Sequence, residues 1–353
     1  MIALDAMGGD FAPRTAVQGA IAAAKQNISI QLFGDEDQIV PLLYQMCPDW
    51  TSLPLTVVHC SDEIDMGQEP SKSVLKKKDS SLVKAVQAVA DGKASAVVSA
   101  GNSGAALVAG TLILGRAPRV MRPAIGDFIP TNNGSIFCID LGANTDSKPA
   151  YLEQFAQMGH VYVHMVKNIE SPRIALLSNG SEPYKGSSLV KQAYILLEKS
   201  HLNFIGNIES RDIFSCDADV LVCDGFVGNI LLKALQGATG AISHWLKKET
   251  SSSWLSKLYF YLGSTIFNKL KRKTDYAKKG GALLLGLNYP FIVAHGCSNA
   301  AAIEQALIFA HQIEEEKFVK LFNEQVAALA EKRSGVTMVV SQKLRSIFGF
   351  RQH

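Results

Sequence analysis

Three turns in this sequence combine glycines with small polar side chains, and each follows an apolar run typical of a β-strand. The runs are Ile2–Asp5, Ala96–Val98 and Asp219–Cys223, and the turns that follow are Ala6–Asp10, Ser99–Gly104 and Asp224–Asn229. Glycines let a ligand approach the backbone closely, and free N–H groups at a helix start favour an anion. We therefore expect these turns to bind phosphate or another small oxyanion.

Four polar side chains at such turns are suited to chemistry on an anion. No Gly-x-Ser-x-Gly motif surrounds Ser99 or Ser103, so we interpret them as hydroxyl donors to phosphate rather than as acylated nucleophiles. Lys185 lies in the polar loop 178–186 and can direct a cation toward a sheet edge. Asn229 follows a Gly-Phe-Val-Gly turn and is placed to donate an amide N–H to an oxyanion. The alternative for Lys185 and Asn229 is a surface or capping role.

The elements that must position these turns alternate between strand-like and helix-like segments, which predicts an α/β protein with a mainly parallel sheet. Ligands of such proteins bind at the carboxyl ends of the strands. We expect helices at 16–26, 81–90, 105–114, from about 145 to 167, 187–199 and 298–331, and strands at 28–33, 55–59, 124–129, 135–141 and 173–177. We treat residues 1–353 as a single α/β domain, in one or two lobes.

The segment 230–279 interrupts this alternation and predicts two consecutive helices joined at Ser251–Ser253. Trp254, Leu258 and Leu262 fall on one apolar face of the second helix. Residues 247–279 hold nine Lys/Arg and two acids, a local charge of +7 in a chain whose formal charge is +3. Two interpretations stay open: a core or dimer helix pair, or a projecting pair that meets anionic lipid.

Composition excludes several classes of protein. The chain opens on Ile2 without a basic and apolar leader, and no apolar run approaches the ~20 residues that span a bilayer, so we expect neither secretion nor membrane insertion. The six cysteines are scattered without a Cys-x-x-Cys pair, which indicates a reducing compartment. His160 and His164 share a helix face, but no third ligand is evident, so no metal is expected. Neither a Walker A motif nor Gly-x-Gly-x-x-Gly is present, which removes support for nucleotide binding through those loops.

Taken in order along the chain, these motifs resemble the bacterial phosphate acyltransferase family called PlsX. The likeness runs from Ile2 to about Ala310, and two departures from it are the neighbours of Lys185 and Cys297, where a serine is more usual. The segments that carry it are 5–10, 69–70, 77–81, 99–104, 122–124, 140–144, 211–214, 224–229, 280–282 and 295–296. The resemblance implies a three-layer fold of the isocitrate dehydrogenase and phosphotransacetylase group. It also implies a homodimer that makes acyl phosphate from acyl-acyl carrier protein and inorganic phosphate, for phospholipid synthesis.

The resulting hypothesis places Lys185 and Asn229 at the reacting centre and requires no cofactor. The expected phosphate ligands are Ser99, Gly101, Asn102, Ser103, Gly104, Gly225 and Gly228. Further substrate contacts are expected from Asp5, Gly8, Gly9, Asp10, Lys77, Asp140 and Asn144. Two alternatives remain: an NAD-dependent decarboxylating dehydrogenase, which would need a carboxylate cluster for a divalent metal, and a non-catalytic scaffold for lipid enzymes.

The remaining expectations concern partners and location. The acidic carrier protein is expected to dock on basic residues near the site, namely Lys76, Lys77, Lys78, Arg116 and Arg119. Trp254, Leu258 and Leu262 are expected to contact an anionic membrane surface. Together these features predict a cytoplasmic protein on the inner face of the cell membrane, able to hand acyl phosphate to the membrane glycerol-3-phosphate acyltransferase. No nucleic-acid partner is expected.

Overall fold

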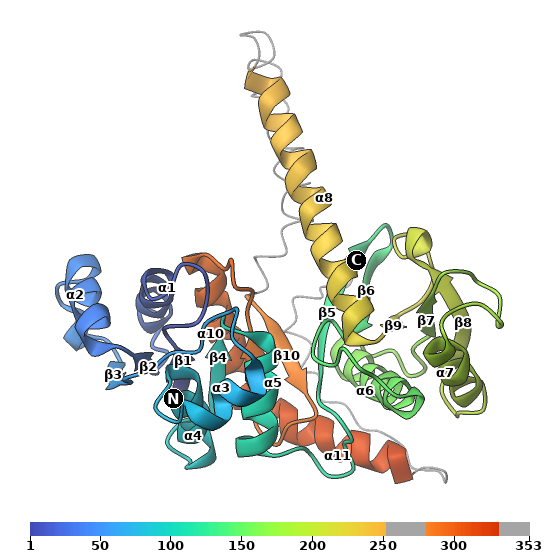
Figure 1. Cartoon of the computed structure of the whole chain (residues 1–353), viewed down its shortest axis with the longest axis horizontal. Coiled ribbons are helices and arrows are strands. Elements are labelled where there is room, and N and C mark those ends of the chain that lie inside the picture. Colours follow the sequence, from blue (N-terminus) through green and yellow to red (C-terminus); the bar gives the residue numbers. More distant parts are fainter. Residues whose placement is uncertain (252–279, 332–353) are drawn as a thin grey trace.

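The computed structural model describes residues 1–251 and 280–331, which contain one sheet of eleven strands in the order β3-β2-β1-β4-β11-β10-β5-β6-β9-β7-β8 (Figure 1). The strands are β1 Ile2–Asp5, β2 Ile30–Gly34, β3 Leu55–His59, β4 Ala96–Ser99, β5 Ala124–Thr131, β6 Gly134–Ile139, β7 Ile174–Ser178, β8 Phe204–Glu209, β9 Val220–Val222, β10 Ala282–Leu285 and β11 Phe291–Val293. The helices are α1 Arg14–Ala24, α2 Glu36–Met46, α3 Pro70–Lys76, α4 Ser81–Ala90, α5 Ser103–Ala109, α6 Pro149–Lys167, α7 Ser188–Glu198, α8 Gly225–Ser251, α10 Ala300–Glu315 and α11 Phe318–Glu331.

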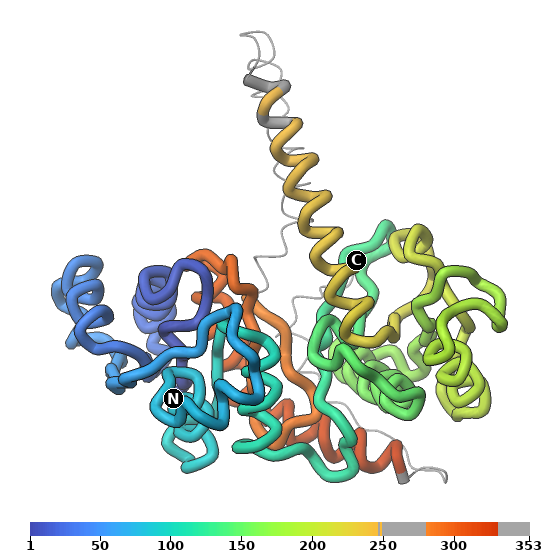
Figure 2. Tube along the Cα trace, in the orientation of Figure 1, coloured from blue at the N-terminus to red at the C-terminus, as the bar shows by residue number. Residues whose placement is uncertain are grey.

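Seven of the ten strand pairs are parallel, which confirms the predicted mainly parallel α/β sheet. The three antiparallel pairs, β11–β10, β10–β5 and β5–β6, are consecutive in the sheet. Three reversals in a row make the half that contains β1 and β4 run opposite to the half that contains β6, β9, β7 and β8. The chain traces these halves in turn, then returns to the first half with β11 and α10, and its described part ends at α11, which packs against α6 of the second half (Figure 2).

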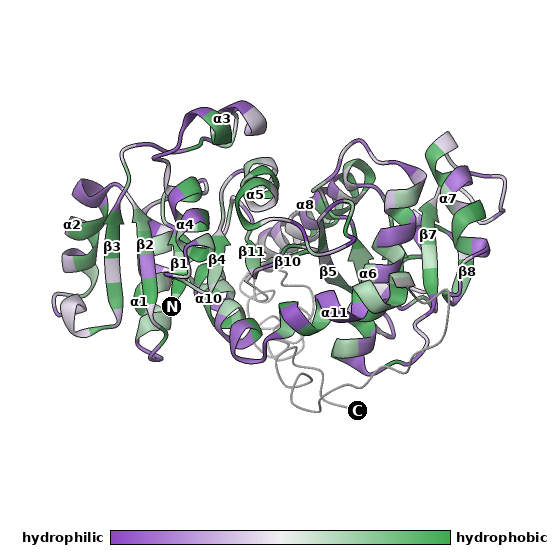
Figure 3. Cartoon of the chain, turned by 90° about the horizontal axis from the view of Figure 1, so that it is seen from below, coloured by the Kyte–Doolittle hydropathy of each residue, from purple (hydrophilic) through white to green (hydrophobic). Residues whose placement is uncertain are grey.

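Buried apolar residues line both faces of the sheet, as the layers of Figure 3 show. On one face Val17, Phe155 and Leu307 from α1, α6 and α10 belong to one cluster, which α11 extends. On the other face α4 and α5 pack on a second cluster, and Leu231, Leu232 and Leu235 of α8 cover part of it. The arrangement is the expected three layers, and the division of the chain into domains stays a prediction.

Local sequence explains where several helices start. Ser80 caps α4 by accepting from the Val83 N–H at 3.4 Å, as the pair Asp79-Ser80 predicts. Asp35 caps α2 in the same way at Asp37, with acidic residues in the first turn. Strands β5 and β6 form the predicted hairpin around 131–134. The helix α2 and the short strands β8, β10 and β11 are additions that the sequence pattern did not show.

Two expected elements need correction. The single C-terminal helix is wrong: α10 ends before Lys317, whose φ of 51° interrupts the helix, and Phe318 and Phe322 of α11 pack against Tyr162 of α6. The helix after Asp224 begins at Gly225 rather than at Ile230, so the expected turn Gly225–Asn229 is helical. The predicted helix 105–114 is confirmed, with a π-helical last part from Gly110 to Leu114.

The helix α8 extends away from the layers (Figure 1). It is the first helix of the expected pair. The second helix lies outside the described residues, together with Trp254, Leu258 and Leu262. None of the helices in the described part of the chain is long and apolar enough to cross a membrane.

Candidate active site

The first group of loops forms at the carboxyl ends of β1, β4 and β11, and comprises residues 6–10, 100–104 and 294–297. These strands are adjacent and parallel, and Asp5 aligns with Ser99, which aligns with Val293. The loops are tied together by hydrogen bonds from the Asp10 N–H to the Gly296 carbonyl at 2.8 Å and from the Ala294 N–H to the Ser99 carbonyl at 2.9 Å. We call this set the first loop group.

Asp5 and Ser99 lie beneath the first loop group rather than facing a ligand. Asp5 is 3% exposed and accepts from the Ser81 hydroxyl at 2.6 Å and the Ser99 hydroxyl at 2.7 Å. Ser99 Oγ also accepts from the Gly101 N–H at 3.1 Å. Burial raises the pKa of Asp5, and the two hydroxyl donors oppose that shift. Asp5 and Ser99 therefore support the first loop group from beneath, and their expected contacts with substrate stay a prediction.

Glycines allow the first loop group to pack closely. A Cβ at Gly8 would lie 2.6 Å from Asp5 Oδ2 and 2.7 Å from the Gly101 nitrogen. Gly9 has a φ of 109°, which a side chain would strain. Asn102 is also occupied, because its Oδ1 caps α5 at Ala105 and its Nδ2 donates to two backbone carbonyls. Of the expected phosphate ligands here, only Ser103 has a side-chain donor without a hydrogen bond among the described residues.

The second loop group forms at the carboxyl ends of β6, β7 and β9, and comprises residues 140–144, 178–186 and 224–229. Asp140 is fully buried, and its Oδ2 accepts from the backbone and side-chain nitrogens of Asn144 at 2.7 and 2.8 Å, while its Oδ1 accepts from the Ala143 N–H at 2.9 Å. Burial raises the pKa of Asp140, and these donors oppose the shift. Asn144 donates further to the Pro123 carbonyl at 2.8 Å. Asp140 and Asn144 therefore shape their loop, and their expected contact with substrate stays a prediction.

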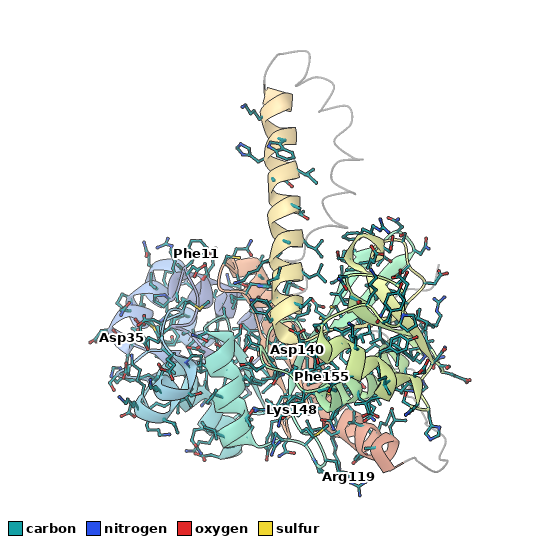
Figure 4. All side chains as sticks on the ribbon, turned by 45° about the vertical axis from the view of Figure 1, so that its right-hand side comes forward. Phe11, Asp35, Arg119, Asp140, Lys148 and Phe155 are labelled. Atoms are coloured by element: carbon teal, nitrogen blue, oxygen red, sulfur yellow. The ribbon has the colours of Figure 1, made fainter. Side chains whose placement is uncertain are left out.

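Gly225 and Gly228 serve helix packing. The Gly225 N–H donates to the Asn144 carbonyl at 2.8 Å, and a Cβ at Gly225 would lie 2.6 Å from the Asn144 nitrogen. A Cβ at Gly228 would lie 1.9 Å from the Asp140 carbonyl oxygen. The first turn of α8 therefore rests directly on the loop 140–144, visible at the base of α8 in Figure 4. Protein backbone fills the space on the Cβ side of both glycines, and their expected contact with phosphate stays a prediction.

Asn229 and Lys185 keep available polar groups. Asn229 lies beside Gly142, where an added Cβ would be 3.6 Å from Asn229 Oδ1, and the Asn229 amide makes no hydrogen bond with a described residue. Lys185 has no ion pair among the described residues, and its Nζ lies 5.8 Å from the centre of the Tyr184 ring. The loops that carry Lys185 and Asn229 follow the neighbouring parallel strands β7 and β9, so both start at the same edge of the sheet.

The two loop groups start from separate parts of the sheet, and the phosphate that both are expected to bind stays a prediction. Opposed strand directions place them at opposite edges of the sheet, although the register brings those edges close. Strand pairing places Ser99, Asp127 and Cys138 in one row across the sheet. Asp140 comes two residues after Cys138, so the start of its loop is offset from that row by ~7 Å along the strand. From β4 to β6 there are four strand spacings, or ~19 Å. The groups flank the short strands β10 and β11.

The five basic residues expected to dock the carrier protein lie in different parts of the structure. Lys77 Nζ binds Asp62 at 2.9 Å and the Glu63 carbonyl at 2.6 Å, so it holds that loop rather than a substrate. Lys76 and Lys78 are exposed. Arg116 pairs with Leu287, which precedes β11 at the end opposite the first loop group, and Figure 4 shows Arg119 far below Phe11. Arg116 therefore lies away from the first loop group, and the docking of the carrier protein on Arg116 and Arg119 stays a prediction.

The sequence reasoning missed His295 as a site residue. It follows β11, lies in the first loop group, and its Nε2 is 3.0 Å from Nε2 of Gln236 on α8. The motif His295-Gly296 was a signal, but no spacing connects it to Gln236, 59 residues earlier on α8.

Residues 1–251 and 280–331 hold no group of three or more His, Cys, Asp or Glu that could bind a metal. His160 and His164 stack with ring centres 6.4 Å apart.

Sequence comparison relates the chain to named families. A family described as "Fatty acid synthesis protein" matches residues 1–321. A phosphate acyltransferase of Pelotomaculum thermopropionicum is 43% identical over 339 residues, which cover 96% of this chain and 98% of that protein. One of Aquifex aeolicus is 45% identical over 320 residues, which cover 90% of this chain and 94% of that protein.

Structural comparison supports the same fold group. The phosphotransacetylase EutD of Staphylococcus aureus matches with a TM-score of 0.53 and 16% identity, over 88% of this chain and 93% of that one. A branched-chain phosphotransacylase of Enterococcus faecalis matches with a TM-score of 0.52 and 17% identity, over 88% and 97%. At these identities the likeness concerns the fold, and it confirms the expected phosphotransacetylase-like architecture.

Proposed function

The chain belongs to the fatty acid synthesis protein family, and we propose that it is a phosphate acyltransferase that forms acyl phosphate for phospholipid synthesis. The observation that carries this proposal is the 43% identity to a phosphate acyltransferase over 96% of the chain. The dehydrogenase alternative has no support, because the described residues lack the carboxylate cluster that it would need for a metal. The scaffold alternative has no support from the comparisons either.

We propose acyl-acyl carrier protein and inorganic phosphate as the substrates. An oxygen of phosphate attacks the thioester carbonyl carbon, and a tetrahedral oxyanion forms. The C–S bond then breaks, its electron pair leaves with sulfur, and the thiolate takes up the proton that the phosphate group releases. Since phosphate is the nucleophile, no serine or cysteine of the enzyme needs to be acylated, and no cofactor takes part. A thiol with a pKa near ~8.5 is a tolerable leaving group.

Asn229 and Lys185 supply what this reaction needs from the second loop group. Asn229 donates to the oxyanion, and Lys185 adds positive charge near the developing anion. Support comes from their positions in neighbouring loops and from the absence of competing bonds to the other described residues. The buried carboxyls of Asp5 and Asp140 hold the two loop groups in shape, so that their backbone is positioned before substrate arrives.

A homodimer at the inner face of the cytoplasmic membrane is part of the proposal. Its support is the exposed apolar surface of α8, where Phe226 is 58%, Ile230 53% and Trp245 65% exposed. Such a surface marks an interaction site. The nine Lys and Arg residues in the segment 247–279 add electrostatic attraction to anionic lipid. From that position the enzyme can supply acyl phosphate to a membrane glycerol-3-phosphate acyltransferase.

The test is a reaction of the pure protein with acyl-acyl carrier protein and phosphate, without metal or NAD, analysed by mass spectrometry. The proposal predicts acyl phosphate and free carrier thiol in equal amounts. A matched reaction with sulfate in place of phosphate serves as the control. Release of free fatty acid alone, or no reaction, would contradict the proposed function.

A further inference from the structure

His295 is held between the two halves of the sheet. Its neighbours Ala294 and Gly296 are bonded to Ser99 and Asp10, which fixes the backbone of the first loop group. The residue remains exposed on one side, so a ligand can reach the ring. Gln236 of α8 contacts the other side, with the two Nε2 atoms 3.0 Å apart.

The contact with Gln236 selects one form of the imidazole. An amide nitrogen only donates a hydrogen bond, so the Nε2 atom of His295 accepts, and the ring is neutral with its proton on Nδ1. Nδ1–H is then a hydrogen-bond donor without a hydrogen bond to a described residue. Because Gln236 fixes the tautomer, the neutral ring donates a hydrogen bond from one defined atom, Nδ1, and carries no positive charge.

The charges around the ring agree with this form. Packing around the ring lowers the pKa of His295, Asp127 of β5 opposes that shift, and Lys233 of α8 reinforces it. Asp10 lies against Gly296, the residue after His295. Lys233 is exposed and has no ion pair among the described residues. Lys233 is near enough to His295 to shift its pKa, so the ring N–H and the ammonium group can act together on an anion.

Spacing on α8 relates this space to the second loop group. Asn229, Lys233 and Gln236 are separated by four and three residues, so they lie on one helical face. Asn229 and Gln236 are seven residues, or ~10.5 Å, apart along the axis. Three contacts of ~3 Å each fit into that length: from His295 to phosphate, from phosphate to the thioester carbonyl, and from the oxyanion of that carbonyl to Asn229.

We propose that His295 and Lys233 bind the phosphate substrate, through the Nδ1–H of His295 and the ammonium of Lys233, with Gln236 as the positioning residue. This inference rests on the proposed function and completes it: phosphate occupies the space between the two loop groups. Ser103 of the first loop group adds a hydroxyl donor from the side of β4. The proposed acyl end of the reaction remains at Asn229 and Lys185.

The first test measures binding of inorganic phosphate by calorimetry, without carrier substrate. His295→Ala is expected to weaken phosphate binding about tenfold or more, the effect of losing one hydrogen bond to a charged ligand. Lys233→Met is expected to weaken it to a similar extent and to remove part of its salt dependence. The matched controls are His311→Ala, whose imidazole pairs with Glu315, and Lys248→Met, further along α8. Affinity within twofold of the wild type in His295→Ala would overturn the proposal.

The second test uses ¹⁵N NMR of the imidazole in the whole protein. We expect the free enzyme to show a protonated Nδ1 and an unprotonated Nε2. Saturating phosphate should raise the pKa of His295, because an anion beside the ring favours its charged form. Gln236→Leu should shift the ring toward the other tautomer and weaken phosphate binding severalfold. A wild-type ring protonated on Nε2, or a pKa unchanged by phosphate, would contradict the assignment.

The wild-type reaction distinguishes a failure of the phosphate pocket from a failure of the proposed function. If the wild-type enzyme forms acyl phosphate and His295→Ala keeps its phosphate affinity, the phosphate pocket is wrong and the function stands. If phosphate binds through His295 and the wild-type enzyme forms no acyl phosphate, the pocket stands and the function is wrong.

Discussion

Gly228 provides a sharp test of how the first turn of α8 is positioned. A Cβ at this residue would lie 1.9 Å from the Asp140 carbonyl oxygen, 2.9 Å from the carbonyl carbon and 3.0 Å from Cys223 Sγ. Ordinary contact begins near 3.4 Å, so in Gly228→Ala the helix or the loop must move by 1.5 Å, the difference between 3.4 and 1.9 Å. The atoms in the way are backbone, held by the hydrogen bonds of Asp140, so a rotamer change cannot relieve the clash.

We expect Gly228→Ala to lower the free energy of unfolding by about 1–3 kcal/mol, the usual cost of overpacking. Because Asn229 is the next residue, a displacement of this size should lower kcat by about 10²-fold. Gly240→Ala is the matched control on the same helix, since a Cβ there meets no described atom within 4 Å. That variant should be unchanged or more stable by up to about 1 kcal/mol, from helix propensity alone.

The measurements are denaturant unfolding and the initial rate of acyl phosphate formation for both variants. A Gly228→Ala protein with wild-type stability and rate would refute the argument that α8 is seated on the Asp140 loop. Equal losses in both variants would indicate a general response of α8 to alanine rather than the clash.

Three further predictions test other parts of the structure. Lys185→Ala should lower kcat by about 10²–10³-fold, the cost of losing one charge-stabilising donor, with Lys191→Ala on α7 as an exposed control; near-normal turnover would remove Lys185 from the site. Burial beside His164 lowers the pKa of His160 to about 4, so the contribution of the neutral ring to stability is complete above pH 6.5 and is lost as the pH falls toward 4. His160→Gln should therefore flatten the dependence of the unfolding free energy on pH between pH 6.5 and 4. An unchanged slope in this variant would contradict a buried neutral ring. Leu258→Glu with Leu262→Glu, outside the described residues, should abolish sedimentation with anionic liposomes while the dimer stays active; dissociation or aggregation would instead show that this face is structural.

Local patterns in the sequence allowed much of the fold to be predicted. Strand 55–59 and helix 81–90 have the predicted bounds, because alternating or helical apolar spacing and the cap at Ser80 are local signals. The break at Lys317 could not be predicted, since it depends on the packing of Phe318 and Phe322 against Tyr162, more than 150 residues earlier. The short strands β10 and β11 give no periodic signal, yet they join β4 to the predicted hairpin β5–β6, whose antiparallel pair reverses the direction of the second half of the sheet.

The same distinction explains the candidate site. The polar turns were visible in the sequence, but which side chains face a ligand depends on partners far away. Asp5 is buried because Ser81 and Ser99 reach it, and Gly228 is needed because α8 meets Asp140. The opposed halves of the sheet, which separate the turns, follow from the order of the strands together with their parallel and antiparallel pairing. His295 was missed because only tertiary structure brings Gln236 to it.

The central claim is that phosphate attacks the carrier thioester directly, between the two loop groups. The most direct measurement is a single turnover of carrier protein bearing a ¹⁴C-labelled acyl group, quenched in denaturant with and without phosphate. We predict that without phosphate the label stays on the carrier and none becomes covalently attached to the enzyme. With phosphate, all transferred label should appear as acyl phosphate. Label attached to the denatured enzyme, formed at a rate that can support turnover, would contradict the claim.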